Sequence, residues 1–332
     1  MRRLKRLWGI INDKNIKIDS IFLPNAPDEN FYYMTGLDGP FEGCFAMLGK
    51  NGAEVAVSEL DYESAKKQGV KKLKLVTKRS EKIGIIKGYS GSGKIGVVAD
   101  KLPYSSGKRL ESMGLKLIDV SSSFEECRMI KDKNEVRLIK TAVNVSKKAL
   151  RDSTSNLTNE NALAAKIEGS MRSRGCGLAF PTICAADKNS ALPHYATGSS
   201  KINKMVLVDF GARFKGYCAD ITRCVFKKRP DWFAKTESKV MKAYDKCVSI
   251  AENGGTGFEM QKAAQSTLGK GFIHSIGHFL GRDVHESSLS NFKTPFVPGM
   301  VFTIEPGFYD VKRGGVRFEN DFLVTKNGVK EL

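Results

Sequence analysis

The chain has 332 residues, of which 41% are hydrophobic and 27% charged, and its 54 basic against 36 acidic side chains give a net charge of +18. This length predicts two domains, and the apolar content is sufficient for sizeable cores. No apolar run approaches the ~18 residues that a membrane span requires, so we expect no membrane partner.

The N-terminus and the cysteines bear on the cellular compartment. The opening segment MRRLKRLWGIINDK is basic, but its apolar stretch Leu7–Ile11 is too short for the core of a signal peptide, and we interpret it as an amphipathic helix. The seven cysteines are odd in number, well spread and without a CxxC pair. They indicate reduced thiols rather than a disulfide framework, and we expect a cytoplasmic protein.

The basic residues occur in small groups, at positions 2–6, 71–74 and 227–229. None of these groups is a long block, and none alternates with aromatic residues as a single-strand binder would. The pattern favours a lysine-rich solvated surface and no specific nucleic-acid partner, although the charge could favour anionic surfaces non-specifically.

Residues 19–127 alternate short strands with helices, which predicts a small α/β domain. The segment Gly88–Lys94 nearly matches a phosphate-binding loop, but Ile95 stands where a Ser or Thr belongs, and a strand follows where a helix should. We therefore interpret it as a plain loop. The expected strands are Ser20–Leu23, Cys44–Leu48, Glu54–Val57, Leu73–Val76, Ile95–Ala99 and Leu115–Val120, and the expected helices are Tyr62–Gln68, Glu81–Lys87 and Ser105–Met113.

The segment Phe124–Lys133 is the predicted junction, which divides the chain into domains of residues 1–127 and 128–332. The second domain mixes antiparallel strands with amphipathic helices, so its predicted class is α+β. Its expected helices are Asn134–Leu150, a helix capped by Thr158 that ends near Arg174, Asp231–Glu252 and Gly257–Leu268.

The stretch Met205–Phe226 has two strand-like runs around a glycine-containing turn, and each run carries one aspartate. A turn centred on Phe214-Lys215 would place Asp209 and Asp220 directly opposite each other, with Cβ atoms roughly 5 Å apart. Two carboxylates at that distance require a proton or a cation between them. The alternative is that one aspartate lies exposed at a strand end.

The other candidate ligands follow along the chain. Carboxylates together with a histidine suit Mn²⁺, Co²⁺ or Zn²⁺, and four carboxylates carry enough charge for two divalent ions. The candidates are the four histidines of the chain, His194, His274, His278 and His285, and the glutamates Glu305 and Glu319.

In this order the motifs resemble those of the "pita-bread" metallopeptidases, which include methionine aminopeptidase, aminopeptidase P and prolidase. The stretch FYYMTGLDG resembles the N-terminal domain of prolidases, aminopeptidases P and creatinases. The resemblance implies a pita-bread catalytic domain behind a small α/β domain, two divalent metal ions, and a homodimer. The matching metal-ligand positions are Asp209, Asp220, His278 in the GHxxG segment, Glu305 and Glu319, and the accessory histidines are His194, His274 and His285.

The resemblance also implies a role for each residue. Asp209 would chelate one metal, His278 and Glu305 the other, and Asp220 and Glu319 would bridge them around a shared water. Glu305 would shuttle the proton, His194 and His285 would donate hydrogen bonds to the substrate, and His274 would line the cleft. Arg317 could clamp a substrate carboxylate, or it could form a structural ion pair with Glu319.

The expected substrates are short proline-containing peptides, and the expected enzyme is an Xaa-Pro dipeptidase. The alternatives are an Xaa-Pro aminopeptidase and, less favoured, a non-catalytic binding protein on the same fold. Two features depart from the family pattern. Asn320 follows Glu319 where an aspartate is usual, and Phe279-Leu280 and Arg282-Asp283 replace smaller or apolar residues.

Overall fold

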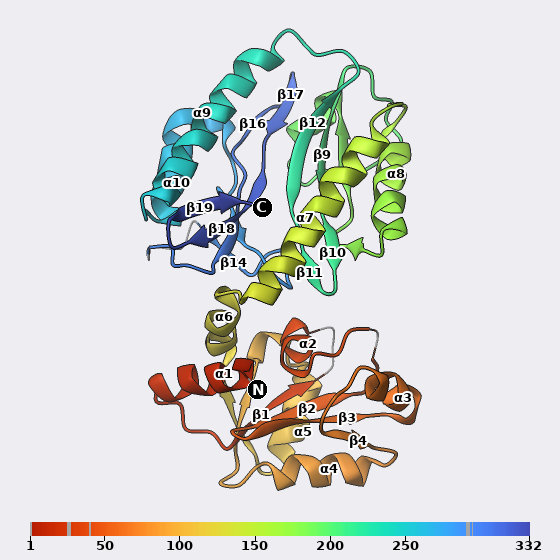
Figure 1. Cartoon of the computed structure of the whole chain (residues 1–332), viewed down its shortest axis with the longest axis vertical. Coiled ribbons are helices and arrows are strands. Elements are labelled where there is room, and N and C mark those ends of the chain that lie inside the picture. Colours follow the sequence, from red (N-terminus) through yellow and green to blue (C-terminus); the bar gives the residue numbers. More distant parts are fainter. Residues whose placement is uncertain (1, 25–27, 40, 290–292, 294) are drawn as a thin grey trace. The chain divides into compact units, whose positions relative to one another are not determined.

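A computed structural model describes residues 2–24, 28–39, 41–289, 293 and 295–332. The chain folds into two compact units, Met1–Arg128 and Met129–Leu332, whose elements are labelled in Figure 1. Within the described residues, no helix is both long and apolar enough to cross a membrane.

The first unit is built on a six-stranded sheet with the order β4-β3-β2-β1-β5-β6. The expected strands and helices of this half are confirmed, with ends within three residues of the predicted positions. The strands are β1 (Ser20–Pro24), β2 (Phe45–Gly49), β3 (Gly52–Val57), β4 (Leu73–Leu75), β5 (Lys94–Val97) and β6 (Lys116–Asp119). The helices are α1 (Arg2–Asp13), α2 (Glu29–Thr35), α3 (Glu59–Lys67), α4 (Arg79–Gly88), α5 (Tyr104–Ser112) and α6 (Ser121–Met129).

Two local predictions for this unit are confirmed. Helix α1 is amphipathic and buries Leu7 and Ile11 in the core. The glycine-rich segment after α4 is a loop that leads into strand β5, where the carboxylate of Asp19 accepts hydrogen bonds from Ser92 Oγ and the Lys94 N–H. A carboxylate held in that loop would repel a phosphate, which agrees with our rejection of a phosphate-binding loop.

The second unit has four long helices, α7 (Lys133–Ser153), α8 (Glu160–Ser173), α9 (Phe233–Glu252) and α10 (Gly257–Leu268). The predicted cap of α8 was wrong by one residue: the Asn159 side chain, not Thr158, accepts the Ala162 N–H. Asparagine satisfies the free amides of a first turn well. The boundary between the two units, at Arg128 and Met129, falls within the predicted junction, whose first residues belong to helix α6.

The strands of this unit form two halves, each covered by a helix pair (Figure 1). Helices α7 and α8 share one hydrophobic core with the β8–β12 region, and α9 and α10 share another with the later strands. The first half contains β7 (Gly177–Leu178), β8 (Ile183–Ala186), β9 (Met205–Phe210), β10 (Ala212–Phe214), β11 (Tyr217–Cys218) and β12 (Ile221–Phe226). The second contains β13 (His278–Phe279), β14 (Ser287–Ser288), β15 (Val301–Ile304), β16 (Gly307–Asp310), β17 (Gly314–Arg317), β18 (Asn320–Thr325) and β19 (Gly328–Glu331).

The expected hairpin is present, but its predicted register was wrong. Strand β9 pairs with β12 so that Asp209 lies opposite Thr222, and Phe214 pairs with Tyr217. The turn is therefore Lys215-Gly216, with φ angles of +48° and +80°. A two-residue hairpin turn of this kind needs positive φ at both central positions, which glycine adopts freely and a phenylalanine resists. Because the shift is two residues along the partner strand, Asp220 stays on the face of Asp209 as a diagonal neighbour.

The backbone approaches itself closely just before Asp220. A Cβ atom on Gly211 would overlap the carbonyl of Ala219, and the Ala219 N–H in turn donates to the Ala212 carbonyl. Only a residue without a side chain fits at position 211, so this glycine fixes the path of the chain that presents Asp220.

We expect Gly211→Ala to lower the free energy of unfolding by about 2–3 kcal/mol, since the added methyl group must displace backbone rather than a flexible side chain. The matched control is Gly169→Ala on helix α8, where an added Cβ meets nothing within 4 Å. The control should be stabilised by about 0.5–1 kcal/mol. Urea unfolding of both variants measures the difference, and a Gly211→Ala variant as stable as the wild type would contradict the close approach.

Candidate metal centre

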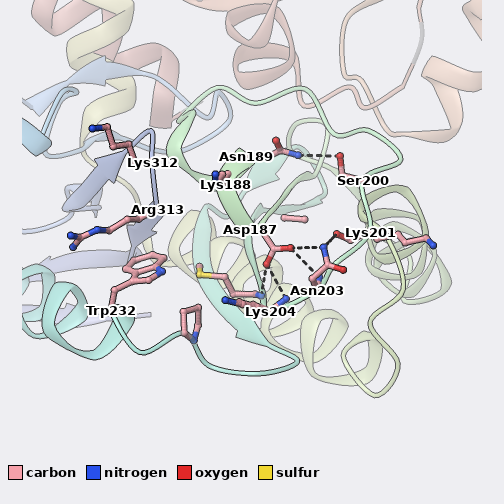
Figure 2. A pocket seen from close by; sticks show the side chains of 13 residues that line it. Asp187, Lys188, Asn189, Ser200, Lys201, Asn203, Lys204, Trp232, Lys312 and Arg313 are labelled. Atoms are coloured by element: carbon pink, nitrogen blue, oxygen red, sulfur yellow. Dashed lines mark hydrogen bonds between the residues drawn. The ribbon is translucent and has the colours of Figure 1, made fainter.

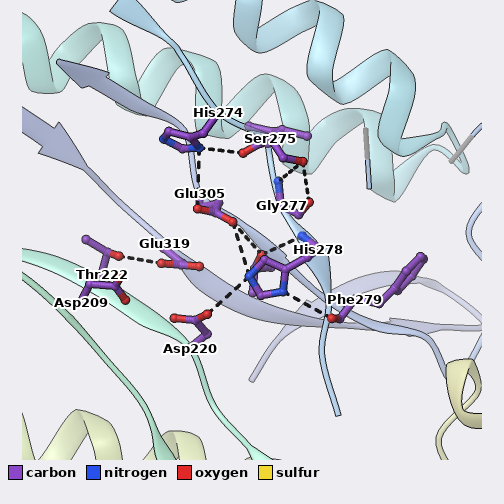
Figure 3. Close-up of polar contacts among 12 residues, drawn as sticks. Asp209, Asp220, Thr222, His274, Ser275, Gly277, His278, Phe279, Glu305 and Glu319 are labelled. Atoms are coloured by element: carbon purple, nitrogen blue, oxygen red, sulfur yellow. Dashed lines mark hydrogen bonds and ion pairs between the residues drawn. The ribbon is translucent and has the colours of Figure 1, made fainter. Parts of the chain in front are cut away.

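Five strand ends and their adjoining loops bring the predicted ligands together (Figure 3). Asp209 lies on β9, Asp220 directly precedes β12, and His278 begins β13. Glu305 directly follows β15, and Glu319 lies between β17 and β18. The strands carry these side chains to one point although the first, Asp209, and the last, Glu319, are 110 positions apart in sequence.

The ligand atoms are close enough to share metal ions. His278 Nε2 lies 3.4 Å from Asp220 Oδ2 and 3.5 Å from Glu305 Oε1. Side-chain atoms within 4.8 Å of one another occur in three groups: Asp209, Asp220 and Glu319; His278, Glu305 and Glu319; and Asp220, His278 and His285. Asp220, His278 and Glu319 each belong to two of these groups. Asp220 and Glu319 are the carboxylates among them, and a carboxylate has two oxygens with which to bridge two ions.

Burial makes ionisation of the carboxylates in this cluster energetically unfavourable. Burial, and then the negative charges of Asp209 and Asp321, raise the pKa of Asp220 well above its usual range. Burial and the charge of Asp220 likewise raise the pKa of Glu319, and burial raises that of Glu305. The ionised carboxylates thus need either protons or a cation among them.

Three carboxylate oxygens of the cluster are evidence in favour of a cation. Asp209 Oδ1, Asp220 Oδ1 and Glu319 Oε1 are buried and accept no hydrogen bond from the described residues. Buried carboxylate oxygens ordinarily have a donor or a metal ion as a partner. Oxygen ligands combined with one imidazole fit divalent ions such as Mn²⁺ or Co²⁺.

The buried guanidinium of Arg317 is held by ion pairs and hydrogen bonds to other residues of the site. Its Nη2 lies 2.6 Å from Asp209 Oδ2, and its side chain is 4% exposed. Its Nε lies 4.0 Å from Glu319 Oε2, so Asp209, which the sequence did not indicate, is its close ion-pair partner. The same guanidinium donates to Thr222 Oγ1 at 2.8 Å and to Tyr309 Oη at 2.9 Å.

Sequence reasoning missed three residues that orient the ligands. Thr222 Oγ1 donates to Glu319 Oε2 at 2.6 Å. Asp321 accepts the Asp220 N–H at 3.1 Å, and burial raises the pKa of Asp321 to about 7. Tyr309 links Arg317 to His274 Nε2, which lies 2.8 Å from its hydroxyl. The correct hairpin register would have placed Thr222 opposite Asp209. No local sequence pattern indicates a role for Tyr309 or Asp321.

The unusual Asn320 makes hydrogen bonds through both ends of its amide. Its Nδ2 donates to Tyr244 Oη at 2.9 Å, and its Oδ1 accepts from Arg223 Nη2 at 2.6 Å. An amide both donates and accepts, so it serves the two partners at once.

The centre opens into a cleft of about 500 Å³ that all of the predicted site residues line. Desolvation and the charge of His278 lower the pKa of His285 to about 4, and desolvation and the charge of Arg317 lower that of His274 to about 4. Both imidazoles are therefore neutral at pH 7, and the rings of His278 and His285 meet edge to face at 4.2 Å. His194 also lines the cleft. The apolar residues of the cleft wall include Phe180 and Val284.

Comparison with known proteins agrees with this geometry. Residues 137–326 match the model of metallopeptidase family M24, and residues 3–130 match the creatinase/prolidase N-terminal domain. The chain is 33% identical over 336 residues to an Xaa-Pro dipeptidase of Pyrococcus horikoshii, covering 96% of this chain and 93% of the relative.

Solved structures show the same fold over the whole chain. The Xaa-Pro dipeptidase of Bacillus anthracis superposes with a TM-score of 0.90 at 29% identity, covering 100% of this chain and 96% of the other. The X-Pro aminopeptidase of Thermotoga maritima gives 0.87 at 27% identity, covering 96% of each chain. With its buried carboxylate–histidine centre and both domain matches, this chain belongs to metallopeptidase family M24 and is a peptidase with a creatinase/prolidase-type N-terminal domain.

Proposed function

We propose that this chain hydrolyses the peptide bond before proline in Xaa-Pro dipeptides and uses two divalent metal ions to do so. The observation that carries the proposal is the buried cluster of carboxylate oxygens without donors at the floor of an open cleft. Relatives named Xaa-Pro dipeptidase that match nearly the full chain support this substrate class.

The residues divide between two metal positions. We assign Asp209 to one ion and His278 with Glu305 to the other. Asp220 and Glu319 would contact both ions, because they are the two carboxylates that belong to more than one group of ligand atoms. We infer Mn²⁺ or Co²⁺ as the native ions, with Zn²⁺ as the alternative. When bound, two such ions lower the pKa of a shared water towards neutrality and polarise the scissile carbonyl.

The chain's own side chains supply the proton transfers and the orientation. Glu305 lies beside His278 in the cleft, and we assign its carboxylate to take up a proton and pass it to the leaving nitrogen. Neutral His285 donates an N–H towards the carbonyl oxygen, where negative charge develops. His194 and His274 line the same cleft, and we assign both to contacts with the substrate.

Arg317 is our candidate for recognising the free carboxylate of a dipeptide. A guanidinium has five N–H donors, and three of its bonds go to Asp209, Thr222 and Tyr309. The remaining donors belong to a side chain that lines the cleft. In this role the planar guanidinium of Arg317 would contact the substrate carboxylate and Asp209 at the same time.

We extend the proposal to location and assembly. None of the seven cysteines, all of which lie in described residues, forms a disulfide, which supports a cytoplasmic protein. A homodimer rests on the family resemblance, and we expect no specific nucleic-acid or membrane partner.

The purified protein should bind close to two divalent ions per chain when Mn²⁺ is supplied, and binding should raise its melting temperature. The double variant Asp220→Asn, Glu319→Gln should lose both effects, because it removes the two bridging charges. Elemental analysis and thermal unfolding measure them. The control is Glu59→Gln, Glu63→Gln on exposed positions of α3, and equal metal content in the two double variants would exclude this metal centre.

Replacing His285 by alanine should leave the metal content intact and lower kcat by about a hundredfold, the effect of one lost donor to a developing oxyanion. His278→Ala should instead lose metal, since this ring lies among the carboxylates. Metal analysis alongside single-turnover kinetics separates the two roles, and equal metal loss in both variants would refute the division.

Substrate length distinguishes a dipeptidase from an aminopeptidase. We expect kcat/KM for Xaa-Pro to exceed that for Xaa-Pro-amide and for Xaa-Pro-Yaa by at least about tenfold, because only the free dipeptide presents its carboxylate at the position of Arg317. Tripeptides cleaved as fast as dipeptides, with amidation harmless, would assign the chain as an Xaa-Pro aminopeptidase.

A further inference from the structure

A second hollow in the catalytic unit shares no lining residue with the catalytic cleft. It has a volume of about 680 Å³, which falls in the range of about 300–1,000 Å³ typical of small-molecule sites. We call it the basic pocket. Its lining residues are Ala186, Asp187, Lys188, Asn189, Ser200, Lys201, Asn203, Lys204, Met205, Pro230, Trp232, Lys312 and Arg313.

The pocket concentrates positive charge from three separate segments of the chain (Figure 2). Figure 2 shows Lys312, Arg313 and Trp232 at the left of the view and Asp187 with Lys204 near its centre. No described carboxylate oxygen lies within 4.0 Å of the Nζ of a lysine in the lining, and the Arg313 side chain has a single ion-pair partner, Asp310, at 3.9 Å. Cations gathered around one concave surface repel one another and attract an anion.

The single carboxylate in the lining does not offset this charge. Asp187 accepts hydrogen bonds from the backbone N–H groups of Asn203, Lys204 and Met205 and from the Asn203 amide, at 2.9–3.1 Å. Although burial acts to raise it, these N–H donors lower the pKa of Asp187. Its oxygens are therefore committed to holding the loop and not to pairing with the lysines.

The neighbouring backbone gives the pocket a fixed frame. The N–H groups of Lys227 and Lys228 donate to the Lys204 carbonyl, so the backbone at these two residues is held against the lining segment. Behind the pocket, the Gly315 N–H donates to Ser190 Oγ at 2.8 Å, and a Cβ on Gly314 would press against the Asp187 carbonyl. The segments that carry Asp187 and Arg313 are thus packed together in a fixed arrangement.

An aromatic side chain forms part of the wall. Trp232 is half-buried, and its indole lies beside Arg313 in Figure 2. An indole face provides a stacking surface for a planar ring, while lysine and arginine side chains bind phosphate oxygens.

We propose that the basic pocket is a second binding site, for a nucleotide-like ligand whose phosphates meet Lys204, Lys312 and Arg313 and whose planar ring lies against Trp232. The catalytic cleft presents carboxylates and imidazoles, so it favours cations where the basic pocket favours anions. The assignment does not depend on which peptides the enzyme cleaves.

Binding of ADP to the metal-loaded protein tests the site. In a Trp8→Phe background Trp232 is the only tryptophan, because the chain contains two, so saturable quenching of its fluorescence by ADP reports on the pocket. We expect the charge reversal Lys312→Glu, Arg313→Glu to weaken ADP binding at least about tenfold, with an affinity that falls as salt increases. The control Lys71→Glu, Lys72→Glu changes the net charge equally at exposed positions of the other unit and should bind ADP as the wild type does.

A second comparison tests the aromatic wall by calorimetry. Trp232→Leu should weaken ADP about tenfold while leaving inorganic tripolyphosphate unchanged, since only ADP has a ring to stack. The phosphates of either ligand can also chelate the catalytic metal ions, and this contribution would be the same in all variants. Measuring the metal content of every variant identifies it. The absence of saturable ADP binding, equal loss in both charge-reversed variants, or equal effects of Trp232→Leu on the two ligands would overturn the proposal.

Discussion

The catalytic unit is organised around mutual repulsion among buried carboxylates. Asp209, Asp220, Glu305 and Glu319 converge with one imidazole where the surrounding protein shields them from most of the solvent. A chain would not retain such a cluster for stability, because burying unpaired negative charge costs several kcal/mol per group. The cluster is therefore best explained by the cations that it binds.

The scaffold restrains these charges with groups that are themselves buried. Arg317 donates to Asp209, and Thr222 connects Arg317 to Glu319 in a continuous set of hydrogen bonds. The Asp220 N–H is held by Asp321 on the neighbouring strand. These contacts orient Asp209 and Glu319 through their side chains and Asp220 through its backbone, which is how surrounding residues position the ligands of a metal centre.

The two pockets show how one chain separates opposite charges. The overall charge is +18, yet the catalytic cleft is floored by carboxylates, and the lysine-rich surface lies elsewhere. The segments between them are short: β9 runs from Met205 in the basic pocket to Asp209 at the metal centre, and β17 runs from beside Arg313 to Arg317. The two sites are therefore only a few residues apart in sequence. The extended, hydrogen-bonded strands β9 and β17 hold them at separate positions.

The sequence by itself determined which chemistry is present and which segments carry it. Local periodicity fixed α10 at Gly257–Leu268 and the strand around Asp209, because helix and strand patterns are set by neighbouring residues. The order of Asp209, Asp220, His278, Glu305 and Glu319 identified the family, since such a series over separate motifs seldom arises by chance. Tertiary structure alone decided the hairpin register, where the positive φ of Lys215 and Gly216 moved the turn by one residue. It also decided that Arg317 pairs with Asp209 across 108 positions of sequence and that Trp232, Lys204 and Arg313 line one pocket. Contacts of this kind depend on how strands from distant segments are aligned, and no local pattern of residues encodes that alignment.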